Sequence, residues 1–441
     1  DRFGRKGALN VGLCVFAIGS IVAAFGGEAT TLITGRAVMG LGAALVMPAT
    51  LSILTNVFPP QERAKAIGVW AGVAGAGGAI GPIVSGVLLA HFWWGSIFFL
   101  NIPVVLVALV GGWFLVPTSH DPAEAQLDLP GAALSIGAVG SLIYAIIEAP
   151  DRGWTNTTTL LWFAAAVVFG MAFAARELTA TAPMLDLRYF RRRGFTGGSI
   201  AISMMFFGMF GMFFVLTQYL QLVRGWSALN SGFRTLPFAV TIMVVAPMSA
   251  RFAEKFGAKR VVSSGVFVAG CGMFLLSRAN IDTAYGYLVV ALVVLAAGMG
   301  LTMAPSTASI MASLPLAKAG VGSAMNDTNR ELGGAVGVAV LGSIVATRYG
   351  AALGDSLRGA PPQVADAARR SLGAALGIAD QLRRPGLAQA AKVAFVDAMS
   401  VALTVGAAVA VVAAVIVYLV LPTHVHASEE QDRYGGREAE D

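Results

Sequence analysis

Long apolar segments recur along the whole chain and are separated by short polar segments. Twelve of the apolar segments are long enough to cross a lipid bilayer, which takes about 20 residues in a helix. They cover approximately residues 8–26, 30–56, 66–90, 94–116, 129–149, 158–175, 196–222, 231–250, 261–278, 285–312, 330–348 and 395–421. The pattern predicts an all-α integral membrane protein with twelve spans present.

The third apolar segment is unusually rich in small residues. These fall on two neighbouring ridges at a spacing of four: Gly77, Gly81 and Ser85, and Gly78, Pro82 and Gly86. Small residues at this spacing let a neighbouring helix approach closely, and Pro82 removes one helical hydrogen bond and should bend the helix. From the residues alone, we interpret the segment as a close helix-packing surface.

Composition supports a membrane protein. Of the 441 residues, 56% are hydrophobic and only 12% are charged, whereas soluble proteins average about 25% charged residues. The mean hydropathy is +0.74. We therefore expect most of the chain to lie in lipid.

The net charge of +6 could suggest nucleic-acid binding, but the basic residues gather on alternate polar segments. If the start of the chain is cytoplasmic, the cytoplasmic segments carry Arg2, Arg5, Lys6, Arg63, Lys65, Arg176, Arg188, Arg191, Arg192, Arg193, Arg251, Lys255, Lys259, Arg260, Lys318, Arg330, Arg433 and Arg437. The short outer loops carry only Arg152, Arg224 and Arg278; the long segment from Arg348 to Lys392, with seven basic residues, is an exception. This positive-inside distribution predicts that both ends are cytoplasmic and that nucleic acid is not a partner.

Two parts of the chain repeat each other in the same order. Residues 77–86 read GGAIGPIVSG and residues 333–342 read GGAVGVAVLG, which are identical at six of ten positions. The basic segment RFGRK at 2–6 matches KFGAK at 255–259. Because the copies keep their order and their direction through the membrane, we interpret them as two parallel-repeated helical bundles.

The repeat also predicts helices upstream of residue 1. The second basic segment follows two spans, 196–222 and 231–250, whereas the first lies at the start of the sequence. We therefore expect two missing spans at the N-terminus and fourteen spans in the complete protein. The segments 129–149 and 158–175 then form a helix pair inserted between the two halves.

These elements divide the chain into an N-terminal bundle at 1–116, an inserted two-helix pair at 129–175, a C-terminal bundle at 196–421 and a cytoplasmic tail at 422–441. The C-terminal bundle contains an outer loop at 349–393. This loop fits either a short amphipathic helix on the membrane surface or a solvated connector.

The first residues of the chain, DRFGRK, read from the charges alone as a solvated loop that obeys the positive-inside rule. In context they resemble the end of the loop signature of the major facilitator superfamily. The resemblance implies that the charges of this loop latch neighbouring helices and help to gate alternating access. The gating-loop candidates are Asp1, Arg2, Gly4, Arg5 and Lys6.

Arg36 lies inside the second apolar segment. A cation there is costly in lipid and needs an interior cavity or an ion pair. Its surroundings, Leu32-x-x-x-Arg36-x-x-x-Gly40-x-Gly42, resemble the second signature of the same superfamily, although Met39 replaces the glutamine often found there. The resemblance implies that Arg36 takes part in proton coupling by tuning a nearby carboxylate.

The glycine-rich third segment, Gly77-x-x-x-Gly81-Pro82-x-x-x-Gly86, resembles the antiporter signature of that superfamily. Further segments resemble the fourteen-span drug:proton antiporters of the EmrB/QacA type: 93–103, Asp128-Leu-Pro-Gly131, 214–227 and 320–343. The resemblance covers essentially the whole chain. It implies the major facilitator fold and a proton gradient, rather than a cofactor, as the energy source.

Three charged residues lie at the cytoplasmic start of the span with the second glycine repeat: Asp327, Arg330 and Glu331. Asp327 and Glu331 share a helix face if the helix already runs there. A carboxylate in a cavity can carry a proton or a cationic drug, so both are proton-coupling candidates with Arg36; the alternative is an ion pair with Arg330. The secondary candidates are Arg330 and the two carboxylates at the ends of one inserted span, Asp128 and Glu148, for which interfacial capping is the simpler interpretation.

These features predict proton-driven export of lipophilic or cationic drugs by alternating access. A dedicated exporter of a single natural product or antibiotic fits the same residues. A membrane enzyme or receptor would need a catalytic cluster or an effector domain, and the sequence shows no metal-ligand spacing, nucleophile constellation or phosphate-binding loop. We expect drug-like small molecules, protons and the bilayer as partners, no metal and a monomer.

Overall fold

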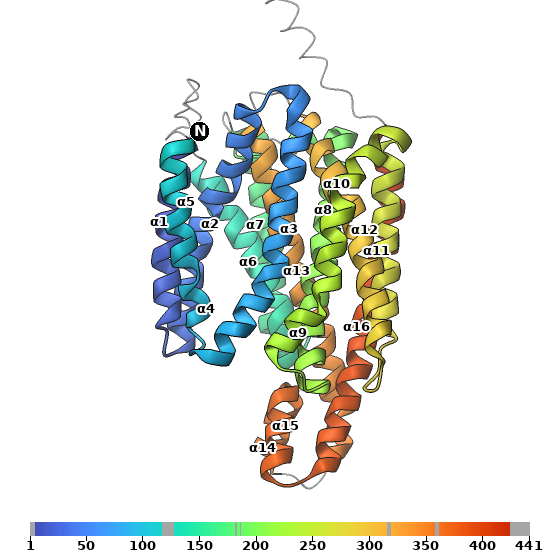
Figure 1. Ribbon diagram of the computed structural model, residues 1–441. Helices are drawn as coiled ribbons and strands as arrows, with labels where there is room; N and C mark the ends of the chain where they lie inside the picture. The colour runs from blue at the N-terminus through green and yellow to red at the C-terminus, as the bar shows by residue number, and fades with distance from the viewer. Residues whose placement is uncertain are drawn as a thin grey trace, which may run out of the picture.

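The computed structural model describes residues 5–116, 128–180, 183–185, 187–314, 319–357 and 361–423, with the backbone alone at Arg5, Ala319, Gly320, Asp355, Ser356 and parts of 52–82. All regular secondary structure in these ranges is helical. The long helices run side by side along one axis (Figure 1). Helix α1 begins at what we call the upper end of the bundle and finishes at the lower end.

The N-terminal part contains α1 (Arg5–Ala24), α2 (Ala29–Val57), α3 (Pro60–His91), α4 (Ser96–Phe99) and α5 (Asn101–Leu115). Helix α1 packs against α2 and α5, whereas α3 packs mainly against α9 (Ala228–Arg234) and α10 (Leu236–Phe256) of the C-terminal part. Pro60 starts α3 because its fixed φ suits the first helical position. The two halves of the chain therefore meet along α3.

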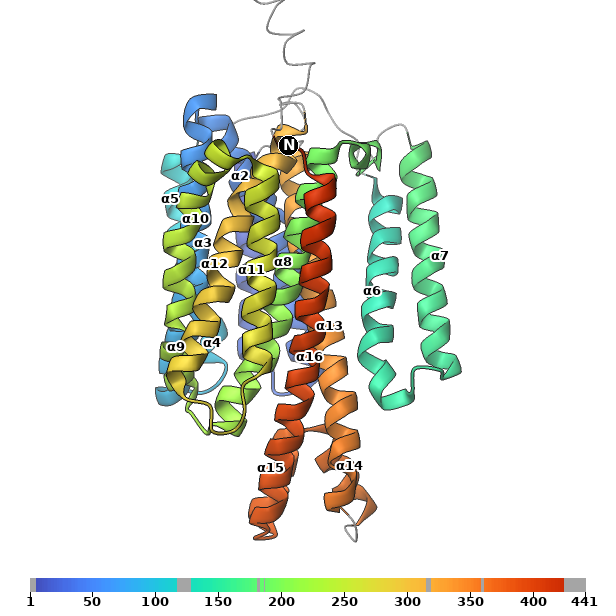
Figure 2. The same cartoon turned by 90° about the vertical axis from the view of Figure 1, so that its right-hand side faces the viewer.

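The inserted pair consists of α6 (Leu129–Arg152) and α7 (Thr157–Thr179). The two helices form an antiparallel hairpin on one side of the molecule (Figure 2), where α6 packs against α13. Asp128 caps α6 by accepting a hydrogen bond from the Gly131 N–H, and Asn156 caps α7 by accepting one from the Thr158 N–H. Gly153, with φ of 101°, ends α6 in a conformation that favours glycine.

The C-terminal part is built around α8 (Arg193–Gln218), which continues into η2 (Tyr219–Val223). Around it lie α9 (Ala228–Arg234), α10 (Leu236–Phe256), α11 (Ala258–Ser277), α12 (Tyr285–Ala312), α13 (Ala319–Ala352) and α16 (Pro385–Val420), and η1 (Leu187–Arg191) precedes it. Helix α8 packs against α12, α13 and α16. The large buried core belongs to this part, whereas the N-terminal cluster is built on Leu9, Leu13, Ala49 and Val105.

The second glycine repeat lies where α13 approaches α8. A Cβ on Gly333 would lie 2.2 Å from the Ser203 carbonyl oxygen, and one on Gly337 would lie 2.2 Å from the Phe207 carbonyl oxygen. Only glycine permits backbone contact at these positions. The sequence-based interpretation of the repeat as a close packing surface is confirmed for this copy.

The helices agree with the predicted spans. Eleven helices in the described ranges are long and apolar enough to cross a membrane, and α3 coincides with the remaining predicted span. Two spans differ in detail because each contains a break, at Leu100 between α4 and α5 and at Thr235 between α9 and α10. The predicted cytoplasmic tail falls outside the described residues from 424 onward.

The predicted outer loop 349–393 is largely helical instead. Helices α13 and α16 run past the other helices at the lower end (Figure 2), and η4 (Gly354–Leu357), α14 (Pro362–Arg370) and α15 (Leu372–Gln381) follow α13 and precede α16 along the chain. The Tyr349 hydroxyl donates to the Ala368 carbonyl at 3.1 Å, and α15 packs against α16. This segment projects along the bundle axis, because its alanine-rich faces pack on the extended ends of α13 and α16.

Candidate functional site

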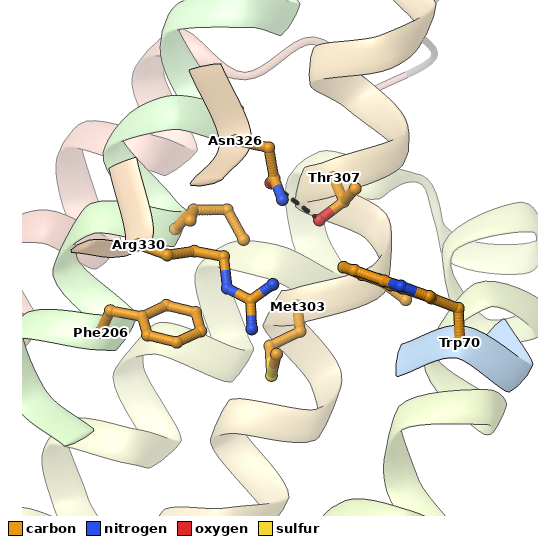
Figure 3. A pocket seen from close by; sticks show the side chains of 8 residues that line it. Trp70, Phe206, Met303, Thr307, Asn326 and Arg330 are labelled. Atoms are coloured by element: carbon orange, nitrogen blue, oxygen red, sulfur yellow. Dashed lines mark hydrogen bonds between the residues drawn. The ribbon is translucent and has the colours of Figure 1, made fainter. Parts of the chain in front are cut away.

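A narrow pocket lies where the two halves meet. It is lined by Trp70 of α3 and by residues of α8, α12 and α13: Ile202, Phe206, Met303, Ala304, Thr307, Asn326 and Arg330 (Figure 3). Its volume of about 10 Å³ is enough for about one water molecule. Trp70 lies ten residues after the start of α3, about 15 Å below the upper end of that helix. The pocket is therefore within the bundle.

Arg330 is held in this pocket by rings and by a carboxylate. Its guanidinium carbon lies 4.7 Å from the centre of the Phe206 ring and 5.7 Å from that of Trp70. Its Nη1 lies 3.7 Å from Asp327 Oδ1, and both side chains are mostly buried. A cation from the C-terminal half thus contacts an aromatic residue of each half.

Several polar groups around Arg330 are available to a ligand or to water. Thr307 Oγ1 donates to Asn326 Oδ1 at 3.1 Å, which holds one buried amide in place. Among the described residues, neither carboxylate oxygen of Asp327 accepts a hydrogen bond, and Asn329 Nδ2 has no acceptor. Buried polar atoms are normally hydrogen-bonded, so Asp327, beside Arg330, is open to water or to a ligand, whereas Asn329 lies two residues along α13 on another side of the helix.

Glu331 does not line the pocket. Helix α13 does run through 327–331, so the condition for Asp327 and Glu331 to share a helix face is met. The Glu331 side chain is nevertheless exposed on the surface of the described bundle. The structure pairs Asp327 with Arg330, whose side chain lines the pocket, and the roles of Asp327 and Glu331 in proton coupling stay predictions.

Arg36 is also exposed, on α2, and no hydrogen bond or ion pair joins it to another described residue. The glycines of its motif differ from each other. A Cβ on Gly42 would lie 2.5 Å from the Phe16 nitrogen, so Gly42 allows α2 to approach α1, whereas none of the described atoms lies within 4 Å of such a Cβ on Gly40. Proton coupling through Arg36 remains a prediction.

The antiporter motif on α3 has one residue in close contact. A Cβ on Gly86 would lie 2.6 Å from the Leu229 Cα, so this glycine brings α3 against α9. No described atom lies within 4 Å of such a Cβ on Gly77 or Gly81. Pro82 lies within α3, and its side chain is outside the described part. Packing through Gly77 and Gly81 stays a prediction.

Most of the gating-loop candidates lie outside the described residues. Asp1, Arg2 and Gly4 belong to that group, and Arg5 is described only by its backbone at the start of α1. Lys6 Nζ donates to the Trp113 carbonyl oxygen at 2.8 Å and lies 5.6 Å from the centre of the Trp113 ring. Lys6 thus joins the start of α1 to the end of α5.

Two of the three secondary candidates, Asp128 and Glu148, occupy opposite ends of α6, and the third is Arg330 of the pocket. Asp128 Oδ1 accepts from the Gly131 N–H at 2.9 Å and lies 3.3 Å from Arg176 Nη2. The Gly131 N–H, and then the Arg176 guanidinium, lower the pKa of Asp128, while burial acts in the opposite direction. At the lower end, Glu148 Oε2 pairs with Arg152 Nε at 2.7 Å. Asp128 thus caps the start of α6, and a role for either carboxylate in proton coupling stays a prediction.

A second hollow adjoins the pocket and was not found from the sequence. It has a volume of about 400 Å³ between the end of α2 and the start of α3, and its lining residues are Leu54, Phe58, Glu62, Ala66, Val69 and Trp70. This volume is in the range of sites for drug-sized molecules. The sequence did contain a pattern that could have indicated it, because Glu62, Ala66 and Trp70 recur every four residues and so lie on one face of a helix. Trp70 lines both hollows.

The chain matches known proteins over most of its length. The family model of the Major Facilitator Superfamily matches residues 1–338. The multidrug efflux pump LfrA of Mycolicibacterium smegmatis is 37% identical over 385 residues, which cover 87% of this chain and 76% of the relative. The tetracenomycin C resistance and export protein of Streptomyces glaucescens is 33% identical over 426 residues, 94% of this chain and 79% of the relative.

Solved structures match in fold alone. The proton:xylose symporter XylE, a member of the same superfamily, has a TM-score of 0.58 at 15% identity, with 98% of this chain and 84% of the symporter covered. A POT family transporter in complex with a thioalcohol-conjugated peptide has a TM-score of 0.57 at 15% identity, with 95% of this chain and 82% of that transporter covered. The sequence match, the repeated helical bundles and this fold agree, and the chain belongs to the major facilitator superfamily of membrane transporters.

Proposed function

We propose that this protein exports lipophilic or cationic drug-like molecules across the cytoplasmic membrane of a bacterium in exchange for protons. The observation that carries the proposal is the position of the Asp327–Arg330 pair. It lies inside the bundle, in contact with an aromatic residue from each half and one side chain away from a drug-sized hollow. Relatives named as a multidrug efflux pump and as an antibiotic export protein support export as the direction.

The adjoining hollows suggest a route for the substrate. The larger one has aromatic and aliphatic walls and one carboxylate, Glu62, which suits a lipophilic cation. Trp70 separates it from the pocket that contains Arg330. In this proposal, a change in the position of α3 relative to α8 and α13 moves Trp70 and opens the inner pocket to the substrate.

Exchange follows if proton and substrate compete for the same carboxylate. When Asp327 is ionised, it pairs with Arg330 or with a cationic substrate. A proton on Asp327 removes that attraction and releases the substrate, while the rings of Phe206 and Trp70 still stabilise the guanidinium of Arg330. Two ligands that exclude each other at one site give the reciprocal coupling that an antiporter needs. Glu331 and Arg36 remain additional candidates for this coupling.

We also propose that the complete transporter is of the fourteen-span type, with two more helices in its N-terminal half. In the C-terminal half, α8 fills the centre and contacts the glycines of α13. The matching glycines of α3, Gly77 and Gly81, have open space beside them within the described structure. A central helix in the N-terminal half would occupy this space. In this arrangement the upper end is cytoplasmic, both ends of the chain lie inside, and the protein works as a monomer without a bound cofactor.

Dye efflux from energised cells tests the proposal. The complete gene is expressed in a pump-deficient bacterium, and ethidium retention is followed with and without an uncoupler. We expect lower retention that the uncoupler reverses, and loss of this effect in Asp327→Asn. Glu148→Gln serves as the matched control, because its carboxylate pairs with Arg152 at the lower end of α6. If cells with good membrane expression of the protein retained as much ethidium as cells without it, multidrug export would be refuted.

A dedicated exporter of one natural product is the second candidate function. The tetracenomycin C export protein, 33% identical to this chain, favours it. The two candidates differ in breadth. A dedicated exporter leaves ethidium in the cell and instead raises the resistance of the host to one antibiotic, which a panel of growth-inhibition assays detects.

A further inference from the structure

Two buried carboxylates approach the same glycine, Gly131, at the upper end of the inserted helix pair, away from the pocket. Asp128 precedes α6, and Glu177 lies in the last turn of α7. The Asp128 side chain is 1% exposed and Glu177 is 3% exposed. A Cβ on Gly131 would lie 2.7 Å from Asp128 Oδ2 and also 2.7 Å from Glu177 Oε1. One oxygen of each carboxylate therefore points at the same place, which is open only because residue 131 is glycine.

The other oxygen of each carboxylate has donors. Asp128 Oδ1 accepts from the Gly131 N–H at 2.9 Å and from Arg176 at 3.3 Å, and Glu177 Oε2 accepts from the Leu185 N–H at 2.8 Å. The two facing oxygens, Asp128 Oδ2 and Glu177 Oε1, are buried and accept no hydrogen bond from any residue in the described ranges. If both groups were ionised, two negative charges would face each other without a donor, which is a costly arrangement.

We propose that the Asp128–Glu177 pair holds one proton, bound to Glu177 Oε1 and donated to Asp128 Oδ2. This assignment gives both facing oxygens a partner. The donors on Oδ1 lower the pKa of Asp128, which is why Asp128 is the acceptor. Mg²⁺ or Ca²⁺ would need six or more oxygen ligands, whereas the described part of this site offers two free oxygens, neither of which solvent reaches.

The charges on neighbouring elements are compatible with one bound proton. Arg176 contacts Asp128, and a proton between the carboxylates makes this group of three neutral overall. The adjacent η1 carries Arg188 and Arg191, and the remaining charges of α6, Glu148, Asp151 and Arg152, lie at its other end. The charges of α13, which packs against α6, are Asp327, Arg330, Glu331 and Arg348.

The bound proton would stabilise the contact between three segments: the start of α6, the end of α7 and the segment that contains Leu185. The start of α6 and the end of α7 meet through the two carboxylates, and Glu177 also accepts from Leu185 in the segment that leads to α8. In the unfolded chain a glutamate is ionised at neutral pH, so the folded protein would bind more protons than the unfolded one. Stability then falls as the pH rises, until the folded state releases the proton.

Amide substitutions test the proton, because an amide N–H can replace the carboxyl O–H. Thermal unfolding in detergent is measured from about pH 5 to about pH 9 for the wild type, Glu177→Gln, Asp128→Asn and the double variant. In Glu177→Gln the amide donates permanently to Asp128 Oδ2. We expect its midpoint to match the wild type at low pH and to lose the decline at high pH. In Asp128→Asn the new N–H donates to an ionised Glu177, so this variant also folds.

The double variant gives the sharpest result. Its two NH₂ groups face each other without an acceptor, so its midpoint should fall by more than the sum of the two single changes, by at least about 2–4 °C. Glu148→Gln is the matched control, since its carboxylate is 31% exposed and pairs with Arg152, and it should keep the pH dependence of the wild type. As a second readout, infrared spectra should show a protonated-carboxyl band in the wild type that Glu177→Gln lacks.

Three outcomes would overturn the proposal. In the first, both single amide variants are more stable than the wild type at low pH. That result indicates two ionised carboxylates that repel each other in the wild type. Stabilisation of the wild type by Mg²⁺ or Ca²⁺, lost in each single amide, indicates a metal ion instead. Absence of the carboxyl band from the wild type excludes a bound proton directly. Each readout is independent of dye efflux, so it does not depend on the proposed transport activity.

Discussion

The contact between α8 and α13 predicts a specific effect of one methyl group. In Gly337→Ala, the new Cβ would lie 2.2 Å from the Phe207 carbonyl oxygen, and ordinary contacts of a Cβ begin at 3.4 Å. The obstructing atom is backbone, so a rotamer change cannot relieve the clash. The helices must separate by about 1 Å or bend locally.

The expected loss of stability is about 2 kcal/mol. An extra methyl group in a well-packed interior costs about 1–3 kcal/mol, and the rigid contact favours the upper part of this range. Replacing glycine by alanine within a helix stabilises the folded state by about 0.5–1 kcal/mol, which offsets part of this loss. The apparent unfolding midpoint should therefore fall by about 4–8 °C. Efflux should also fall, because Phe206 of α8 and Arg330 of α13, now 4.7 Å apart, would separate.

Thermal unfolding in detergent at a fixed scan rate measures the change, and dye efflux measures its effect on transport. The control is Gly170→Ala on α7, where no described atom lies within 4 Å of the new Cβ. This control should be unchanged or slightly more stable. If Gly337→Ala were as stable as Gly170→Ala, the helices would not be in the contact described and the reasoning would fail.

Four further substitutions test side chains in or near the membrane. Asp327→Asn should abolish drug-driven proton release in vesicles, and Glu331→Gln is expected to do the same; unchanged release would remove that carboxylate from the coupling. Arg330→Lys should lower the rate of dye efflux by about tenfold, since an ammonium loses the planar contact with Phe206; a full rate would argue against this contact. Arg234, 3.7 Å from the centre of the Trp226 ring, stabilises the lower end. Arg234→Leu should lower the unfolding midpoint by about 2–4 °C, and no shift would show that the stacking contributes little.

The helices could be predicted because hydrophobic length alone determines them. A run of about 20 apolar residues has no other stable form in lipid, so the spans follow from the sequence even where Pro48 or Pro305 lies inside a helix. The close contact at Gly333 and Gly337 could also be predicted, because small residues on one helix face have few other uses. The partner helix, α8, could not be identified from that pattern.

The site could be predicted only in part. Asp327 and Arg330 stand out in the sequence because charges in a span are rare. The residues that surround them in the folded protein cannot be identified in this way. Trp70 and Phe206 come from distant parts of the chain and reach Arg330 only through packing of the two halves. Likewise, the sequence marks Asp128 within a short motif, whereas Glu177 becomes its neighbour only when α6 and α7 form their hairpin. Local patterns identify the charged residue, and tertiary packing selects its partners.

Helix α13 is long enough to join the inner pocket to the projecting segment at the lower end. One uninterrupted helix carries Arg330 in the inner pocket and, further along, Tyr349, which donates to Ala368 of the projecting α14. In the proposed transport cycle, a tilt of α13 would therefore move the inner pocket and the projection together. In the proposed orientation this projection lies outside the cell. A nanobody that clamps α14 and α15 would restrict the tilt of α13 and stop transport without crossing the membrane.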